Sequence, residues 1–469
     1  MDSFSPHQKK PLLLLLWLLF GSCFVFTNVG GSKSVVKTLP GFPPGTTLPF
    51  TLETGYITVG EEEDVELFYY FIESERDPET DPLLLWLTGG PGCSGFSGLV
   101  YEMGPLRFDF EAFDKDGSAQ LILNPYSWTK RANIIFLDSP VGTGFSYNTT
   151  EEGYNTSDTK ASEDVYTFLR KWFLENPKFM KNRLYIAGDS YAGKVIPLAV
   201  LTIAQGIEAG VKPKMHLQGY ILGNPVTDDR IDGNAQIPYS HRLAILSDKY
   251  YKMAKVYCKG EYTNPDPGNA LCQYALQLFQ MCIKDIFRDH VLEPVCKPTL
   301  GDDYSFIRLI SPRSPRRCRD DNYIVSHIWA NDIAVQEALH VRNGTIKEWR
   351  RCNRELLHYD FNMESVVPYH KLLTDKGIQA LVYSGDHDMV VPYIGTLEWI
   401  RLLNLTVDDD WRPWLVDDQV EGYTERYIHK ETQFHLTFAT VKGAGHTAPE
   451  YNPKQCLAML ERFLDSDSL

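Results

Sequence analysis

The sequence predicts an α/β protein with a doubly wound, mostly parallel sheet and a disulfide-stapled cap insertion. Four short, mostly apolar runs, each followed closely by Gly or Asp, stand at residues 83–87, 133–137, 184–187 and 217–222. Runs of this length and composition are typical of buried parallel strands. Helical patterns lie between them, as at 162–173 and 195–209. This alternation of strand and helix indicates a parallel sheet covered by helices on both faces.

The remaining elements can be assigned in chain order. Residues 56–60 and 65–72 flank an acidic turn and are expected to form a hairpin. After Asn224 the alternation stops, and residues 228–321 have little strand character but hold most of the cysteines, so we expect this stretch to be the cap. The sheet domain is expected to close with strands at 380–383 and 436–441 and a helix at 453–464.

The composition fits a globular protein and excludes a nucleic-acid binder. The chain has 469 residues, of which 43% are hydrophobic and 13% aromatic, enough for a sizeable core. Its formal net charge is -15 at pH 7, and no long run of Lys or Arg occurs. Because an acidic surface repels phosphates, no nucleic-acid partner is expected.

Residues 1–31 have the pattern of a secretory signal peptide. Lys9 and Lys10 precede an almost purely apolar run at 12–20, and the small residues at 30–32 offer a cleavage site. The alternative is a membrane anchor, but a span needs about 20 apolar residues, and small or polar residues interrupt this run. We therefore expect a mature domain at 32–469, without membrane contact, in the vacuole or outside the cell.

The cysteines and sequons agree with a secretory destination. Eight of the nine cysteines follow the signal, and four of these fall between residues 258 and 296, as in a locally stapled segment. Spacing alone leaves their pairing open. No CxxC or Cys/His cadence is present, so neither a metal site nor a cofactor is expected. Sequons for N-linked glycans occur at Asn148, Asn155, Asn343 and Asn404.

Residues 188–193 (GDSYAG) join a predicted strand to a predicted helix, which is the context of a nucleophile elbow. The turn is tight, so small residues must flank Ser190. Ala192 stands where the usual pattern has glycine, and Gly193 follows it. Taken alone, the motif is equally consistent with a strand-to-helix turn whose serine caps the helix.

The partners that a catalytic serine needs favour the elbow. An α/β-hydrolase fold requires nucleophile, acid and histidine in that chain order, on loops at the carboxyl ends of strands. Asp388 and His446 each follow a predicted strand in the C-terminal part of the chain. We predict that His446 moves the proton of Ser190 and that Asp388 orients the histidine. Asp386 is the rival acid, assigned here to capping the loop, and His387 is expected to pack in that loop.

An acyl intermediate also requires donors for its oxyanion. A Gly-Gly turn follows the strand at 83–87 and would let backbone N–H groups face a developing negative oxygen. We expect the N–H groups of Gly90 and Tyr191 to form this oxyanion hole. Without Ser190, the turn would be interpreted as an ordinary glycine-rich loop.

Five stretches carry a family resemblance: 86–94 (WLTGGPGCS), 138–147 (DSPVGTGFSY), 188–193 (GDSYAG), 383–388 (YSGDHD) and 443–447 (GAGHT). Together they resemble the serine carboxypeptidase family and span most of the mature chain in the family's order. The resemblance implies the α/β-hydrolase fold and the triad already named.

Two departures from the family pattern bear on the substrate. Thr88 and Asp189 stand where family peptidases usually carry the Asn and Glu that grip a C-terminal carboxylate, whereas the third acid, Glu102, is kept. With Gly89, these residues form the expected substrate-binding set. A threonine hydroxyl donates to a carboxylate less readily than an amide does, and Asp189 withdraws its carboxyl by one methylene. The Thr and Asp versions resemble plant serine carboxypeptidase-like acyltransferases.

The resemblance to that branch implies an acyltransferase. Such enzymes move an acyl group, often phenolic, from a 1-O-β-glucose ester to an alcohol, so small-molecule donor and acceptor are the expected partners. A serine carboxypeptidase that releases C-terminal residues at acidic pH is the alternative, because the triad and Glu102 are intact. A third hypothesis, a non-catalytic companion subunit, is disfavoured by the complete triad.

The resemblance also implies three disulfides, joining Cys93 to Cys352, Cys258 to Cys272, and Cys296 to Cys318. Cys282 and Cys456 would then remain as buried free thiols. Some relatives lose a linker near the last pair and become two disulfide-linked chains. Residues 311–317 could be such a processed loop, with a simple exposed basic loop as the alternative.

Overall fold

The computed structural model describes residues 33–60, 64–295, 318–353 and 358–469. The predicted signal peptide, Cys296 and the loop at 311–317 therefore lie outside the described residues. Within the described ranges, no helix is both long enough and apolar enough to cross a bilayer.

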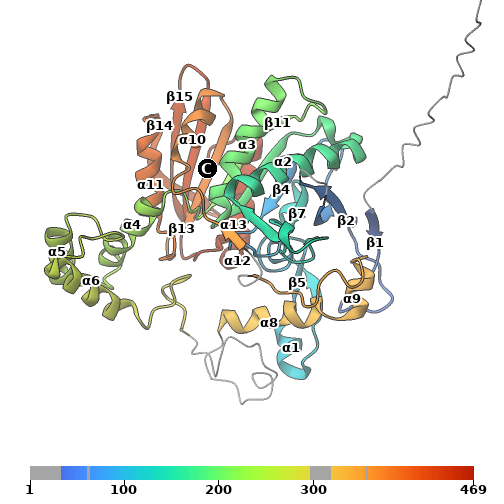
Figure 1. Ribbon diagram of the computed structural model, residues 1–469, viewed down its shortest axis with the longest axis horizontal. Helices are drawn as coiled ribbons and strands as arrows, with labels where there is room; N and C mark the ends of the chain where they lie inside the picture. The colour runs from blue at the N-terminus through green and yellow to red at the C-terminus, as the bar shows by residue number, and fades with distance from the viewer. Residues whose placement is uncertain (1–32, 61–63, 296–317, 354–357) are drawn as a thin grey trace, which may run out of the picture. The chain divides into compact units, whose positions relative to one another are not determined.

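A sheet of 12 described strands forms the centre of the unit Gly31–Leu469 (Figure 1). Its central strands are parallel, in the spatial order β7 (Asn133–Leu137), β4 (Leu83–Leu87), β10 (Leu184–Asp189), β11 (Leu217–Gly223), β13 (Gln379–Gly385) and β16 (Phe434–Val441). Antiparallel strands extend both edges: β1 (Lys33–Val36), β2 (Leu52–Val59), β3 (Val65–Ile72) and β8 (Tyr147–Asn148) beside β7, and β15 (Gln419–His429) and β14 (Thr406–Val416) beside β16. The prediction of a doubly wound, mostly parallel α/β sheet is confirmed.

Two hydrophobic cores, one on each face, explain why the central strands are apolar throughout. On β4, Leu83 and Leu85 belong to one core, and Leu84 and Trp86 to the other. The helices of the first core are α2 (Asp158–Glu175), α3 (Ala192–Glu208), α10 (Val367–Asp375) and α11 (Tyr393–Leu402). Those of the second are α1 (Phe110–Asp116), α8 (Arg319–Ala330), α9 (Ile333–Ala338), α12 (Ala448–Tyr451) and α13 (Pro453–Asp465), with the small sheet β5 (Leu106–Phe108) and β6 (Leu121–Leu123).

The stretch predicted to be the cap, residues 228–321, is largely helical where the structure describes it. Its helices α4 (Asp229–Arg242), α5 (Asp248–Cys258) and α6 (Ala270–Ile283) enclose a third core, and α5 and α6 lie as a pair away from the sheet (Figure 1). α8 and α9 follow this stretch, and their buried side chains belong to the second core, on the sheet. The chain then reaches β12 (His358–Asp360), which pairs with β9 (Asn155–Ser157).

Disulfides stabilise the cap and the glycine-rich loop that follows β4. Cys93 bonds to Cys352, and Cys258 bonds to Cys272 between α5 and α6. Cys318 is also disulfide-bonded, and its expected partner lies outside the described residues. Of the two free thiols, Cys456 is buried as expected, but the expectation of burial was wrong for Cys282, which is only half-buried on α6.

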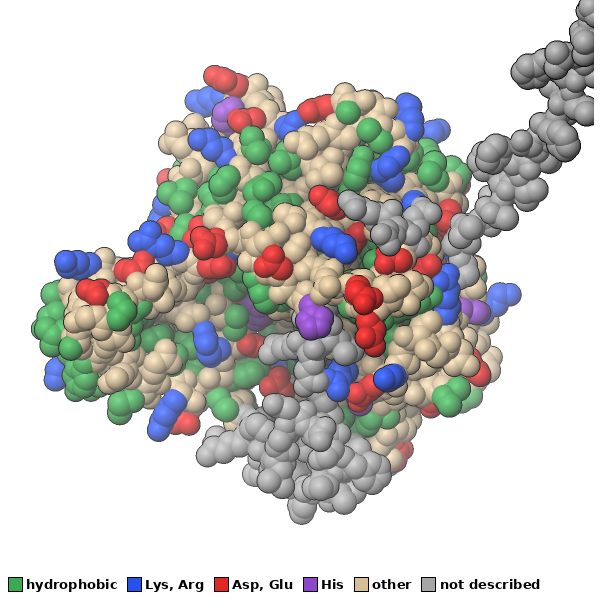
Figure 2. Space-filling model, in the orientation of Figure 1, with side chains coloured by type: hydrophobic (Ala, Val, Ile, Leu, Met, Phe, Trp, Pro, Cys, Tyr) green, Lys and Arg blue, Asp and Glu red, His purple; other side chains and the backbone are tan. Residues whose placement is uncertain are grey.

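The four predicted glycan sites differ in how exposed their asparagines are. Asn155, Asn343 and Asn404 are exposed. Asn148 is only 6% exposed, and its amide nitrogen donates to Asp64. The folded chain therefore presents three of these nitrogens to solvent and argues against a glycan at Asn148. On the face of the molecule shown in Figure 2, acidic and basic side chains are interspersed over the surface.

Candidate active site

The predicted nucleophile lies in a sharp turn between β10 and α3. Ser190 has a φ of 53°, in the left-handed region that non-glycine residues rarely adopt. Two backbone hydrogen bonds of 2.9 Å hold it there: its N–H donates to Gly223 O, and its carbonyl accepts from Val226 N–H. The turn thus holds the serine at the carboxyl edge of the sheet, as a nucleophile elbow requires.

Close backbone packing explains why glycine stands one position later than usual. A Cβ on Gly193 would lie 2.6 Å from both Pro225 Cβ and Val226 O, closer than real contacts allow. Ala192 keeps a Cβ because its side chain lies beside Gly188, where any added Cβ would come within 2.9 Å of it. Gly188 and Gly193 therefore supply the two close approaches that the turn needs.

The structure brings Ser190, His446 and Asp388 into one hydrogen-bonded row. His446 Nε2 lies 2.7 Å from Ser190 Oγ, and His446 Nδ1 lies 2.8 Å from Asp388 Oδ2. Asp388 is fully buried. Burial alone would lower the pKa of His446, but the charge and hydrogen bond of Asp388, together with the charges of Asp289 and Asp189, raise the pKa to about 9.

Asn224, at the end of β11, orients the triad acid, and sequence reasoning did not assign it this role. Its Nδ2 donates to Asp388 Oδ2 at 2.8 Å, and its Oδ1 accepts from Gly385 N–H at 3.0 Å. The available signal was its position: a polar residue directly after a central parallel strand lies at the edge where such sites form.

The rival acid and its neighbouring histidine lie in the loop rather than in the triad. Asp386 Oδ1 accepts from Gly443 N–H at 2.7 Å and lies 2.5 Å from His387 Nδ1. These contacts join the acid loop to the histidine loop. Asp388, not Asp386, is therefore the carboxylate that lies within hydrogen-bond distance of His446.

Two backbone N–H groups remain available for an oxyanion. Gly90, with a φ of 119°, follows Gly89 at the end of β4, and Tyr191 follows the nucleophile. Among the described residues, neither N–H donates to a protein acceptor. Gly89 differs, because its N–H donates to Asp189 Oδ1 at 3.1 Å. The turn therefore has the donors that stabilise a tetrahedral intermediate.

Gly89 is expected to tolerate no side chain. A Cβ there would lie 2.6 Å from Ser190 Cβ and 2.7 Å from Tyr191 N. Gly89→Ala should push the oxyanion turn off the elbow and lower kcat by about 100-fold. Steady-state kinetics with a small ester will measure this, with the exposed Gly117→Ala in a distant loop as the control. Equal kcat values for the two variants would contradict the packing argument.

The predicted substrate-binding side chains gather beneath the oxyanion turn. Thr88 Oγ1 accepts from Trp86 Nε1 at 3.2 Å, which leaves its own proton free for a ligand. Asp189 and Glu102 are buried, at 2% and 4% exposure. One Asp189 oxygen holds the Gly89 N–H. The Asp189 carboxyl therefore uses one of its two oxygens to stabilise the oxyanion turn, and that oxygen is not available to a substrate.

Burial raises the pKa values of both of these acids, which favours their protonated forms at acidic pH. Burial, followed by the charge of Asp189, raises the pKa of Glu102 well above its usual range. Burial also raises the pKa of Asp189 to about 6, against the opposing effects of His446 and the Gly89 N–H. Below that pH the site holds two neutral acids, which can donate hydrogen bonds.

A family model described as serine carboxypeptidase matches residues 40–466. The chain belongs to the serine carboxypeptidase family. It is 46% identical to serine carboxypeptidase-like 7 of Arabidopsis thaliana, with 99% of each chain covered. It is 43% identical to serine carboxypeptidase-like 19 of the same plant, with 97% of this chain and 99% of the relative covered.

A solved structure agrees on the fold of this serine carboxypeptidase-like chain. A prohormone-processing carboxypeptidase from Saccharomyces cerevisiae superposes with a TM-score of 0.72, covering 92% of this chain and 95% of the other. At 19% identity the likeness concerns the fold alone. It confirms the α/β-hydrolase architecture that the order of Ser190, Asp388 and His446 predicts.

Proposed function

We propose that this enzyme transfers an acyl group from a 1-O-β-glucose ester to an alcohol through an acyl-Ser190 intermediate. The observation that carries the proposal is the hydrogen bond from Gly89 N–H to Asp189 Oδ1. It commits this shortened carboxyl to the oxyanion turn, so little of it remains to grip a peptide's C-terminal carboxylate. Thr88 beside it offers a hydroxyl that suits a neutral sugar.

Both half-reactions use the same proton carrier. Ser190 Oγ attacks the ester carbonyl while His446 Nε2 accepts its proton, and the N–H groups of Gly90 and Tyr191 stabilise the oxyanion. Collapse breaks the bond to glucose, which leaves with the proton from His446. An acceptor alcohol then gives its proton to His446 and attacks the acyl carbonyl, which releases the new ester and restores Ser190.

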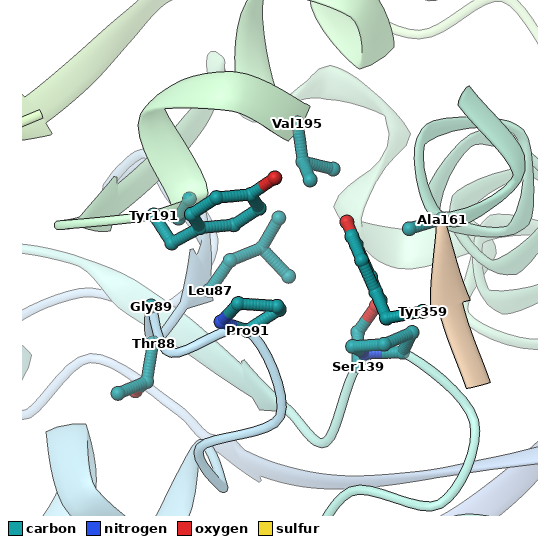
Figure 3. A pocket seen from close by; sticks show the side chains of 11 residues that line it. Leu87, Thr88, Gly89, Pro91, Ser139, Ala161, Tyr191, Val195 and Tyr359 are labelled. Carbon is teal, nitrogen blue, oxygen red and sulfur yellow. The ribbon is translucent and has the colours of Figure 1, made fainter. Parts of the chain in front are cut away.

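A pocket beside the elbow is lined mostly by apolar and aromatic side chains, the chemistry that would accept an aromatic acyl group. Figure 3 shows Tyr191 and Tyr359 facing each other across it, with Leu87 and Pro91 between them. Both phenol groups donate to Asp158 Oδ1, at 2.8 and 2.9 Å. The rings are therefore fixed in place in an edge-to-face arrangement, with centroids 5.9 Å apart. They give this side of the pocket an aromatic lining that an acyl group would contact.

The direct test uses two substrates and one inactive control. The glycosylated protein from a secretory host, alongside Ser190→Ala, is mixed separately with a hydroxycinnamoyl or galloyl glucose plus alcohols and with a blocked dipeptide. Serine-dependent consumption of the glucose ester, with a new ester product and the dipeptide intact, is expected. Release of the dipeptide's last residue instead would replace the proposal with the carboxypeptidase alternative.

The carboxypeptidase alternative has one observation in its favour. The raised pKa values of Glu102 and Asp189 leave acids that can donate to a carboxylate at acidic pH. That grip would weaken as pH rises through about 6, the pKa of Asp189. Transfer from a neutral ester needs only the unprotonated base, so its rate should keep rising toward the His446 pKa of about 9. A pH series from 5 to 9 separates the two reactions.

Restoring the peptidase pair should shift the substrate preference. Thr88→Asn with Asp189→Glu adds an amide donor and lengthens the carboxyl, so we expect kcat/KM for the glucose ester to fall about 10-fold or more, equivalent to one lost hydrogen bond. Dipeptide hydrolysis should rise from the background. The single change Asp189→Asn, which keeps the length, serves as the control. An unchanged ratio of the two activities would show that these positions do not select the substrate.

We also propose that the enzyme works in the secretory pathway, in the vacuole or outside the cell. The disulfides of Cys93 with Cys352 and of Cys258 with Cys272 support an oxidising compartment. Fluorescent fusion of the full chain, with and without residues 1–31, tests this. Retention of the full chain in the cytosol would contradict it.

A further inference from the structure

A short segment of the cap, residues 288–291 (the strap), lies against the acid loop. Arg288 O accepts from Met389 N–H at 2.9 Å, and Val291 N–H donates to His387 O at 3.0 Å. These two bonds fall directly before and after Asp388 in the chain. The strap therefore fixes the backbone on both sides of the triad acid.

The same strap holds the histidine loop. Asp289 O accepts from the backbone N–H of His446 at 2.7 Å, and His290 Nε2 lies 3.1 Å from Gly443 O. The approach is so close that a Cβ on Gly445 would lie 2.3 Å from Asp289 O and 2.9 Å from His290 Cβ. The glycine at this position is thus required by the strap, and the catalytic histidine packs directly on it.

The hydrogen bonds of His290 define its tautomer. Leu292 N–H donates to His290 Nδ1 at 3.2 Å, so Nδ1 carries no proton and Nε2 donates to Gly443 O. The ring is 7% exposed and lies between two others, with centroids 5.4 Å from His387 and 4.8 Å from Tyr451. Its orientation is therefore fixed by four neighbours in three separate segments of the chain.

The acid loop and the residues that follow the strap are both held by packing or ion pairs. On the acid loop, Met389 is fully buried in the third core, with Phe279 and Ile283 of the cap. After the strap, Glu293 pairs with Arg319, which also pairs with Glu450 four residues beyond the catalytic histidine. Movement of the strap would therefore be passed to both catalytic loops instead of being absorbed by the cap.

We propose that His290 is a positioning residue for His446, acting through the Gly443 carbonyl and the neighbouring Asp289 peptide. It holds the histidine loop at the distance from the acid loop at which His446 meets both Ser190 and Asp388. The cap is thereby part of the catalytic apparatus and not only a cover for the substrate. Because a misplacement of about 1 Å can cost about 100-fold in rate, a contact this close to the triad has a large effect.

The test compares His290→Ala with His290→Gln, whose amide nitrogen can donate from a similar position. We expect His290→Ala to lower kcat, and the rate at which an organophosphonate labels Ser190, by about 100-fold with KM within about two-fold. His290→Gln should recover at least a tenth of the wild-type rate. The pH at half-maximal rate should fall in His290→Ala. His446 would move away from the charges of Asp388 and Asp289, both of which raise its pKa. Lys284→Ala, exposed on the same cap, is the matched control.

Phosphonate labelling needs the triad and the oxyanion donors but neither a glucose ester nor a peptide, so this test does not depend on which of the two is the substrate. Thermal unfolding of each variant separates a lost contact from a lost fold. The proposal is overturned if labelling by His290→Ala matches that of Lys284→Ala. It is equally overturned if glutamine and alanine are equally slow, or if KM alone changes.

Discussion

Ser190→Ala is expected to lower kcat about a million-fold, the loss typical when the nucleophile of a serine triad is removed. The attacking oxygen disappears, and no other described hydroxyl lies within hydrogen-bond reach of His446 Nε2. The remaining rate would come from the oxyanion donors and from binding. Pre-steady-state mixing with a chromogenic ester measures the change, because the burst of acyl-enzyme should vanish together with turnover.

The substitution is a clean one because alanine fits the turn as serine does. At a φ of 53° both residues carry the same backbone strain, and the backbone bonds to Gly223 and Val226 are unaffected. The melting temperature should therefore stay within a few degrees, and the variant should still bind the glucose ester. Turnover within 100-fold of wild type would rule out a covalent acyl-serine. If the wild type turned over as slowly as Ser190→Ala, the result would instead favour the hypothesis of a non-catalytic companion subunit.

The central sheet could be predicted from the sequence because its strands are buried on both faces. The runs Leu83–Leu87 and Asn133–Leu137 are apolar at every position except Asn133, and the structure gives the same bounds. The outer hairpin of β14 and β15 was not predicted. Most side chains of β14 are exposed, including those of Asp408 and Asp410, so the strand lacks the apolar signal on which the prediction depends.

The candidate site divides along a similar line. Side chains that perform chemistry directly, such as Ser190, Asp388 and His446, follow strand ends and could be found from motif order. Residues that hold those side chains could not, because their roles arise from contacts between distant segments. Asn224 reaches Asp388 across 164 positions, and His290 reaches Gly443 across 153. No local pattern encodes such a pairing, since an asparagine or histidine in a loop is usually a solvated residue.

Asp388→Asn is expected to lower kcat about 10,000-fold while leaving the fold intact, the size of effect seen when a triad acid is neutralised. The Asp388 carboxylate only accepts hydrogen bonds. Its Oδ1 accepts from Val390 N–H, and its Oδ2 accepts from Asn224 Nδ2, Val391 N–H and His446 Nδ1. An asparagine offers one oxygen and one NH2 group. Wherever the NH2 group points, two donors face each other in a fully buried site.

The same substitution makes a second, independent prediction about pH. Loss of the Asp388 charge removes the main effect that raises the pKa of His446 to about 9, so the rising limb of the pH–rate profile should move to lower pH. Asp386→Asn is the matched control, since Asp386 bonds Gly443 N–H and His387 but does not contact His446. Its kcat should fall less than about 10-fold. If Asp386→Asn were the slower variant, or if it alone shifted the limb, the assignment of the triad acid would be reversed. If both variants were equally slow, the acid loop would act as one rigid unit whose position matters more than the charge of either carboxylate.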